Sequence, residues 1–190
     1  MGRPLVNPGT LYWTGQHWMV YLRTPGSDED SGRVSVWHTH YSESGEGTVI
    51  YVDLPGYQAA CTDNREVASF IDHWVRSMPG PYQTDHVIDA EIHREGDIRH
   101  SPSWVVQSED HSIVTTWTDI QSPVILEAPA PRFREDRDVY SYLFFSSGSI
   151  LFDGTPIEGD PYIRDIWKPS IGGDRSSCVI ALSETFVDIP

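Results

Sequence analysis

Two histidines separated by a single residue are the sharpest chemical feature of this sequence. His38 and His40 lie in the run His38-Thr39-His40, and Glu43 and Glu46 follow closely. If the run is extended, residues i and i+2 project to the same side of a strand, about 6–7 Å apart. Two imidazoles at that spacing can work together in proton transfer, or they can ligate one metal ion together with a carboxylate.

These two chemistries assign different roles to the same residues. For acid–base catalysis, His38 and His40 are the candidates for proton transfer, and Asp53 or Glu43 is the candidate carboxylate that orients them. For a metal site, the candidate ligands are His38, His40 and Glu43. The spacing resembles the first half of the cupin motif, in which two histidines on one strand are followed by Glu and Gly. Here Glu43 comes one residue too soon and Glu46 one too late, and no later Pro-x-Gly…His…Asn segment supplies the missing ligand.

Aromatic residues are abundant and provide candidates for lining a ligand pocket. They make up 12% of the chain, with seven Trp, nine Tyr and six Phe. Aromatic rings bury large apolar areas, either in a core or around a ligand. Lys168 is the only lysine, and inside a barrel it could polarise a carbonyl, although most lysines are exposed. His17, next to Trp18, could also face a pocket. The predicted ligand-binding residues are Trp37, Tyr51, Trp117, Tyr142 and Lys168.

Several familiar signatures are missing, which narrows the range of functions. The sequence has no Gly-x-Ser-x-Gly elbow, phosphate-binding loop, Cys-x-x-Cys or His-Glu-x-x-His. Its 28 acidic residues against 13 basic ones, a net charge of −15, disfavour binding to nucleic acid or to an anionic membrane surface. The remaining reactions need few groups, as in dehydration, isomerisation or cyclisation, and they need no organic cofactor.

The elements that must position these residues are mostly strands. Alternating apolar residues, interrupted by turn residues at intervals of about ten, predict many short strands. They cover 10–23, 33–42, 48–54, 86–94, 103–109, 112–120, 123–128, 139–146, 149–152, 162–167 and 177–188. The two strands 139–146 and 149–152 are predicted to form a hairpin over Ser147-Gly148. One amphipathic helix is expected over 64–77, with Thr62 or Asp63 as its cap.

This pattern predicts an all-β fold with one helix, in a single domain over residues 1–190. An antiparallel, lipocalin-like β-barrel is the favoured architecture, and a β-sandwich is the alternative. Whether His38 and His40 reach the interior depends on the strand 33–42. They point inward if Val34 and Val36 do, and outward if Trp37 does.

The expected function is therefore binding of a small, largely apolar or aromatic metabolite in a β-barrel pocket, followed by cofactor-free acid–base chemistry of a lyase, isomerase or cyclase type. A non-catalytic carrier or sensor and a metal-dependent enzyme that uses the pair of histidines are the alternatives. No apolar run has the length of a signal peptide or a membrane span, so a cytoplasmic location without membrane binding is expected. A homodimer is possible, and Cys61 and Cys178 could be paired or free.

Overall fold

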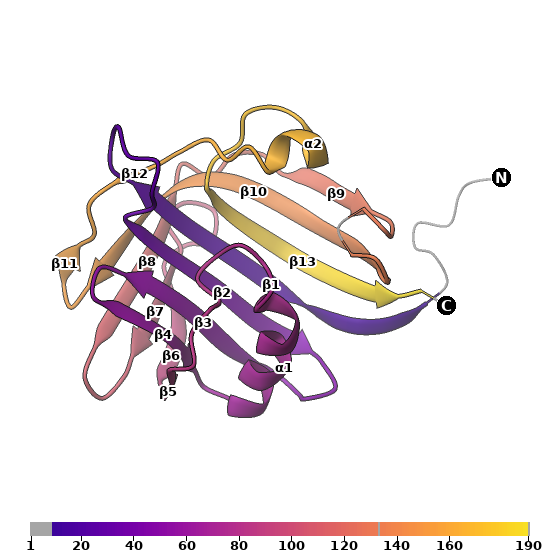
Figure 1. Ribbon diagram of the computed structural model, residues 1–190, viewed down its shortest axis with the longest axis horizontal. Helices are drawn as coiled ribbons and strands as arrows, with labels where there is room; N and C mark the ends of the chain where they lie inside the picture. The colour runs from indigo at the N-terminus through magenta and orange to yellow at the C-terminus, as the bar shows by residue number, and fades with distance from the viewer. Residues whose placement is uncertain (1–8, 133, 190) are drawn as a thin grey trace.

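The strands of this protein form one continuous sheet that curls into a nearly closed barrel (Figure 1). The structure is a computed structural model that describes residues 9–132 and 134–189, so the N-terminal segment examined for a signal peptide lies outside the described residues. Neighbouring strands are antiparallel except for one parallel pair. The prediction of an all-β, lipocalin-like barrel is confirmed.

The described residues contain thirteen strands and two helices. The strands are β1 (Thr10–Arg23), β2 (Gly32–Tyr41), β3 (Gly47–Leu54), β4 (Tyr57–Thr62), β5 (Val87–Asp89), β6 (Glu91–Glu95), β7 (Ser103–Gln107), β8 (Ser112–Thr118), β9 (Val124–Ala128), β10 (Arg137–Phe152), β11 (Thr155–Pro156), β12 (Asp160–Pro161) and β13 (Cys178–Asp188). The helices are α1 (Arg65–Val75) and α2 (Trp167–Ile171). Within these residues, neither helix has the length and the apolar run needed to cross a bilayer.

The two end strands of the sheet are joined in the chain by a single residue. The strand order is β5-β4-β3-β2-β1-β13-β10-β8-β7-β6. β5 lies parallel to β4 at one edge, Ala90 follows, and β6 pairs with β7 at the other edge. The predicted strand 86–94 is therefore two short strands on opposite edges, and their covalent link holds those edges close together.

The interior of the barrel is a packed hydrophobic core in the described part of the chain. Trp18 contacts Trp104 and Trp117 edge-on, with ring centroids 6.0 and 5.0 Å apart. The indole N–H of Trp117 donates a hydrogen bond to the Met19 carbonyl oxygen at 3.0 Å. The other members include Val20, Leu22, Val34, Val36, Ile50, Val52, Cys61, Val106, Ile113, Ile150, Cys178 and Ile180. Both cysteines are free, and burial raises the pKa of the Cys61 thiol to about 11 and that of Cys178 to about 12.

The predicted hairpin over Ser147-Gly148 is wrong, because β10 runs straight through these residues. Residues 137–146 of β10 pair with β13, while residues 147–152 pair with β8. A Cβ at Gly148 would lie 2.7 Å from Val20 Cγ2 and 3.0 Å from Cys178 Sγ. Glycine therefore lets the strand pass close to the core where it changes partners, and its role here is close approach rather than a turn.

Helix α1 covers the outer face of the sheet, and its apolar stripe lies where the sequence predicts it. It packs on β3 and β4 and buries Val67, Ala68, Phe70, Ile71, Trp74 and Val75. The N-cap is Asn64 and not Thr62 or Asp63, since the Asn64 side chain accepts hydrogen bonds from the backbone N–H groups of Glu66 and Val67. Asp63 instead accepts from the Thr48 N–H at 2.6 Å, which ties the helix start to β3.

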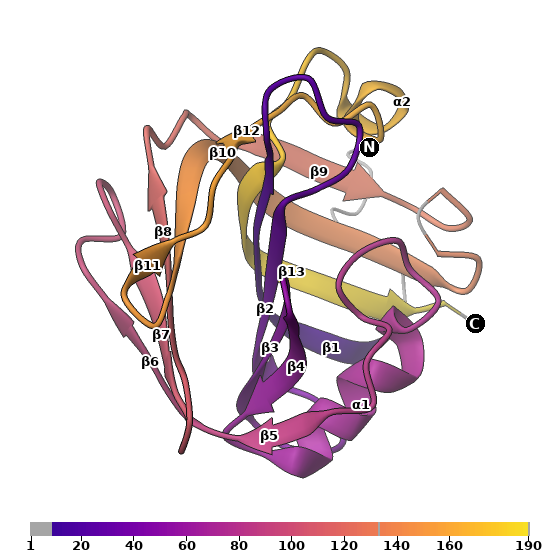
Figure 2. The ribbon, with the colours of Figure 1, turned by 60° about the vertical axis from the view of Figure 1, so that its left-hand side comes forward.

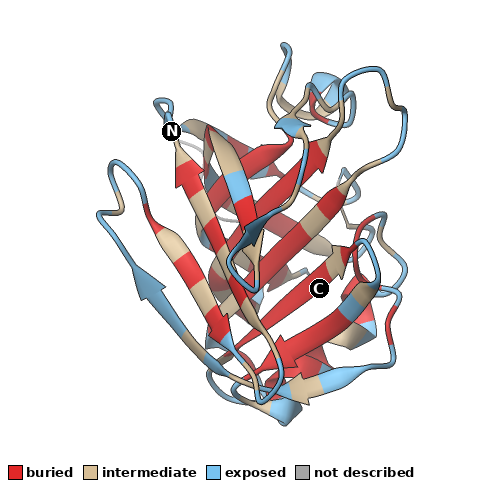
Figure 3. Cartoon of the chain, turned by 90° about the vertical axis from the view of Figure 1, so that its left-hand side faces the viewer, coloured by how far each residue is buried: buried red, intermediate tan, exposed pale blue. Residues whose placement is uncertain are grey.

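A second hydrophobic cluster lies on the outer face. Figure 2 shows that α1, α2 and β9 gather on one side of the molecule, away from β6, β7 and β8. Buried residues run along the central strands, while exposed residues concentrate in turns and edge strands (Figure 3). The outer cluster includes Trp13, Met19, Tyr21, Trp37, Trp74, Tyr82, Leu143, Phe145, Trp167 and Phe186. The sheet is therefore apolar on both faces, and both faces are covered.

Candidate functional site

A cavity of about 280 Å³ lies within the outer cluster, on the side of the sheet opposite the barrel core. Strands β1, β2, β9, β10 and β13 form its floor, and the chain that follows α1, the residues before β10 and the start of α2 cover it. The floor residues are His17, Met19, Tyr21, Trp37, Leu126, Val139, Leu143, Ala181, Glu184 and Phe186. The cover residues are Met78, Pro79, Tyr82, Arg134, Arg164, Ile166 and Trp167.

His17 is fixed in this cavity by a stack and a short chain of hydrogen bonds. Its ring stacks on Trp37, with centroids 3.6 Å apart and 14° between the planes. Its Nε2 lies 2.9 Å from the Ser35 hydroxyl, which in turn lies 2.9 Å from the Tyr82 hydroxyl. Burial, together with the positive charges of Arg164 and Arg134, lowers the pKa of His17 to about 3. The imidazole is therefore neutral at physiological pH.

Glu184 faces His17 across the cavity floor. Its Oε2 lies 3.7 Å from His17 Nδ1 and makes no hydrogen bond within the described residues. Only 10% of its side chain is exposed. Burial raises the pKa of Glu184 to about 8, and the nearby charge of Arg134 offsets a part of this effect. The carboxyl group is therefore mostly protonated at pH 7, so a potential acid and a potential base lie side by side.

A bulge in β13 directs Glu184 into the cavity. Val179 and Ala181 point to the outer face, so simple alternation would direct Glu184 and Phe186 into the barrel. Ser183 instead has φ of 51°, and the register shifts against both neighbours, β1 and β10. The extra residue reverses the alternation, and Glu184 joins His17 on the outer face.

Two arginines complete the cavity. The Arg164 guanidinium lies over the Tyr21 ring, 4.7 Å from its centroid, and the Arg134 guanidinium lies 4.9 Å from the centroid of Trp74. Neither forms an ion pair in the described part of the chain. Burial lowers the pKa of Arg134 from its usual value, although so strong a base keeps its proton.

The predicted pair of histidines lies outside this cavity. Val34 and Val36 face the barrel core, and His38 follows them with its ring 5.2 Å from Trp104. His38 is half-buried and His40 is exposed, with ring centroids 4.8 Å apart. Burial and the charge of His40 lower the pKa of His38. No group of three His, Cys, Asp or Glu side chains among the described residues is arranged to hold a metal ion.

The other predicted catalytic residues are scattered. Asp53 is at the far end of β3, where its carboxylate accepts a hydrogen bond from Arg33 Nε at 3.0 Å. Glu43 is exposed in the turn after β2. Lys168 is also exposed and pairs with Asp165 at 2.9 Å. The structure does not bring these three side chains to His38 and His40.

The predicted lining residues occupy different parts of the molecule. Trp37 lines the cavity, and Tyr51 lies behind it, with its ring 5.1 Å from that of Tyr82. Trp117 is in the barrel core. Tyr142 is 48% exposed on β10, beside the exposed Ile125 of β9. The homodimer stays a prediction.

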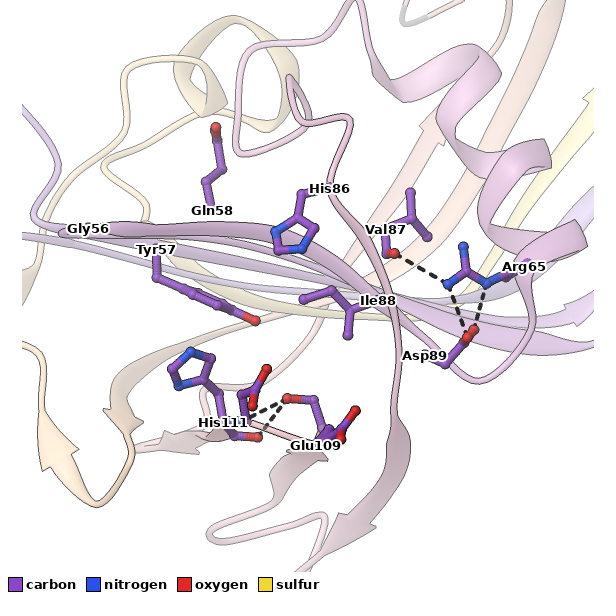
Figure 4. A pocket seen from close by; sticks show the side chains of 12 residues that line it. Gly56, Tyr57, Gln58, Arg65, His86, Val87, Ile88, Asp89, Glu109 and His111 are labelled. Atoms are coloured by element: carbon purple, nitrogen blue, oxygen red, sulfur yellow. Dashed lines mark hydrogen bonds and ion pairs between the residues drawn. The ribbon is translucent and has the colours of Figure 1, made fainter.

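A second, open hollow of about 630 Å³ lies between β4, β5 and the turn that connects β7 and β8. In Figure 4, Arg65 is turned toward Asp89, and the Nε–Oδ1 distance of this exposed ion pair is 2.7 Å. His111, on the other side, pairs with Asp153 at 2.9 Å. Arg65, Asp89 and His111 already have partners, and the hollow is open to solvent, which makes it a weaker candidate than the cavity around His17.

Sequence reasoning identified His17 only as a residue that could face a pocket, and it missed Glu184, Ser35, Tyr82, Arg134 and Arg164. A weak signal for Glu184 was present, since it is a carboxylate in the middle of the closing strand, between the apolar run Cys178–Leu182 and Phe186-Val187. Arg134 lies in a loop segment with no periodic pattern. Arg164 lies in the segment 162–167 that was predicted to be a strand, and this prediction is wrong, because the segment is irregular and leads into α2. Only the tertiary structure could place these two side chains.

Comparisons with protein-family models, with curated proteins and with solved structures give no significant match. The function must therefore be inferred from the site itself.

Proposed function

We propose that this protein binds a small, largely apolar molecule in the outer-face cavity and transforms it by proton transfer involving His17 and Glu184. The observation that supports this proposal is the buried pair itself. A neutral imidazole and a protonated carboxyl group face the same apolar cavity, with Nδ1 and Oε2 3.7 Å apart. Titratable groups with displaced pKa values inside a cleft are typical of catalytic acids and bases.

The hydrogen-bond chain supports a specific division of roles. A neutral His17 that donates its Nε2 proton to Ser35 leaves the Nδ1 lone pair directed toward Glu184 and the bound molecule. Nδ1 would then accept a proton from the ligand while Glu184 gives its proton to another ligand atom. Transfer of the Nδ1 proton to the carboxylate would restore both groups. No net proton is consumed, as isomerisation or dehydration requires.

The cavity size supports a ligand of limited volume. A 150 Å³ apolar cavity can hold a benzene molecule, so about 280 Å³ suits a molecule of roughly two fused rings. Five aromatic side chains contribute to the lining: Tyr21, Trp37, Tyr82, Trp167 and Phe186. They favour a flat or aromatic ligand over a strongly polar one.

The test of binding is mass spectrometry of the small molecules that the purified protein releases on denaturation. The wild type is compared with Ala181→Phe, which fills the cavity, and with Ile125→Phe, which adds the same bulk to an exposed position on β9. We expect a molecule that is present in the wild type and in Ile125→Phe but lost from Ala181→Phe. A molecule retained by Ala181→Phe would place binding elsewhere and overturn the proposal.

Turnover of the molecule identified in this way tests the chemistry. We expect His17→Gln and Glu184→Gln each to lower kcat by about 100-fold or more, since a general acid or base contributes roughly that much. Binding should change little. If both variants bind and turn over the ligand as the wild type does, the pair is not catalytic. If no protein turns it over, the cavity belongs to a carrier.

A further inference from the structure

The charges around the cavity do not balance within the described residues. His17, Glu184, Arg134 and Arg164 are its ionisable lining groups besides the two tyrosines. With His17 neutral and Glu184 protonated, the two guanidinium groups are the remaining charges at pH 7. This is unusual in a chain with 28 acidic and only 13 basic residues, where carboxylates are plentiful.

The hydrogen-bonding capacity of both arginines is also largely unused. Each guanidinium has five N–H donors. In the described part of the chain, the side chain of Arg134 donates only to the thioether of Met78, at 3.2 Å, and that of Arg164 only to the thioether of Met19, at 3.9 Å. Sulfur is a weak acceptor, so most of these donors are available to a ligand.

Aromatic and thioether contacts hold the guanidinium groups of the two arginines in place. Arg164 lies over Tyr21, and Arg134 lies over Trp74 and, at 5.6 Å, over Phe186. Both are half-buried, which strengthens any pairing with an anion relative to a fully exposed site. Both side chains line the same cavity as His17.

We infer that the ligand of this cavity is an anion, a carboxylate-bearing apolar or aromatic molecule whose carboxylate is bound by Arg134 and Arg164. This inference rests on the proposed function and makes it more specific. A planar guanidinium pairs with a carboxylate through two parallel N–H donors. The ligand's apolar body would then lie over Trp37 and His17, near the acid–base pair.

Calorimetric titration with two probes that have the same ring system tests the charge requirement. 2-Naphthoate is anionic at pH 7, and 2-naphthamide is its neutral counterpart of nearly equal shape. We expect the wild type to bind naphthoate at least about tenfold more tightly than naphthamide, as a charge-assisted hydrogen bond implies. Arg134→Met and Arg164→Met keep an apolar side chain. Each should lower the affinity for naphthoate about tenfold and leave the affinity for naphthamide unchanged.

Arg175→Met is the matched control. Arg175 is also half-buried and also lies over an aromatic ring, that of Phe145, but it does not line the cavity. It should leave the affinity for both probes unchanged. Circular dichroism verifies the fold of each variant, and Gln replaces Met at a position where the Met variant does not fold.

The possible failures are distinguishable. If naphthamide binds as tightly as naphthoate, and Ala181→Phe abolishes both, the cavity binds ligands but the inferred anion is wrong. If both Arg variants retain the preference for naphthoate, these arginines do not recognise the carboxylate, and the inference is wrong as well. If neither probe binds, or both still bind to Ala181→Phe, the proposed function fails together with the inference.

Discussion

Glu184 holds a proton that a solvent-exposed glutamate loses well below neutral pH. Burial among apolar neighbours is the main cause, because the charged form loses its hydration there and gains no hydrogen bond in return. The groups that face it are His17, whose burial keeps it neutral, and Arg134, whose charge favours the carboxylate. Because a proton is held in the folded state and released on unfolding, stability becomes linked to pH.

Glu184→Gln should flatten the dependence of stability on pH. The folded-state pKa of Glu184, about 8, is above the ordinary value of 4.5. Well below pH 4.5, the folded and the unfolded state both bind this proton. Between pH 4.5 and 8 only the folded state binds it, so the free energy of unfolding falls as pH rises, and the fall ends above pH 8. Between pH 4.5 and 8, we expect the free energy of unfolding of the wild type to fall by at least about 2 kcal/mol more than that of Glu184→Gln. Urea unfolding at several pH values measures this difference.

The control for this prediction is Glu127→Gln, at an exposed position of β9. The free energy of unfolding of this variant should change with pH in parallel with that of the wild type. The low pKa of His17 contributes equally to both proteins, so it cancels in the comparison. Parallel profiles for Glu184→Gln and the wild type would show that Glu184 is ionised in the folded protein.

The decisive feature at the scale of elements is the bulge in β13. The extra residue at Ser183 shifts the register of β13 against both β1 and β10, and it redirects Glu184 and Phe186 to the outer face. Ser183 is exposed, so a substitution there removes no buried side-chain packing. Its contribution is its backbone conformation, with φ of 51°.

Ser183→Val should destabilise the protein, whereas Ser183→Gly should not. A β-branched residue at positive φ costs about 1–2 kcal/mol, and glycine accepts this conformation freely. Chemical unfolding compares the two variants with the wild type. In naphthoate titrations, Ser183→Val should also bind more weakly, because a relaxed bulge displaces Glu184. Equal stability of the two variants would mean that the bulge does not depend on residue 183.

At the scale of the whole molecule, one sheet serves two purposes on its two faces. The inner face holds a core around Trp18, Trp104 and Trp117, while the outer face holds α1 and the cavity. The proposed ligand site lies outside the barrel, which leaves the core free to be packed for stability. The positions of Trp117 and Trp37 allow a direct test of this separation.

Trp117→Phe should lower stability without affecting the cavity, and Trp37→Phe should affect the cavity. Trp117→Phe loses the hydrogen bond to Met19 and part of the ring volume, so we expect a loss of about 1–3 kcal/mol and unchanged naphthoate affinity. Trp37→Phe weakens the stack with His17 and should reduce naphthoate affinity about two- to tenfold. If Trp117→Phe weakens binding as much as Trp37→Phe does, the ligand enters the barrel.

The sequence by itself determined the fold class, the helix and most strands. Alternating apolar residues and the apolar stripe of α1 report burial over a few neighbouring residues, and such local patterns are readable without a structure. The rest depended on tertiary structure. By residue type Gly148 predicts a turn, and only the closeness of Val20 and Cys178 shows that glycine is needed there for close approach. The bulge at Ser183 is revealed only by the pairing of β13 with its two neighbours.

The position and the lining of the cavity were likewise determined by tertiary structure alone. His17, Glu184 and Arg134 are far apart in the sequence, and no spacing rule joins them. The His38-Thr39-His40 pattern can be recognised in the sequence because its residues are contiguous. The cavity forms instead where five strands meet three covering segments that are far apart in the chain. Chemistry assembled from distant segments is determined by packing and register, and a sequence read along one chain does not display either.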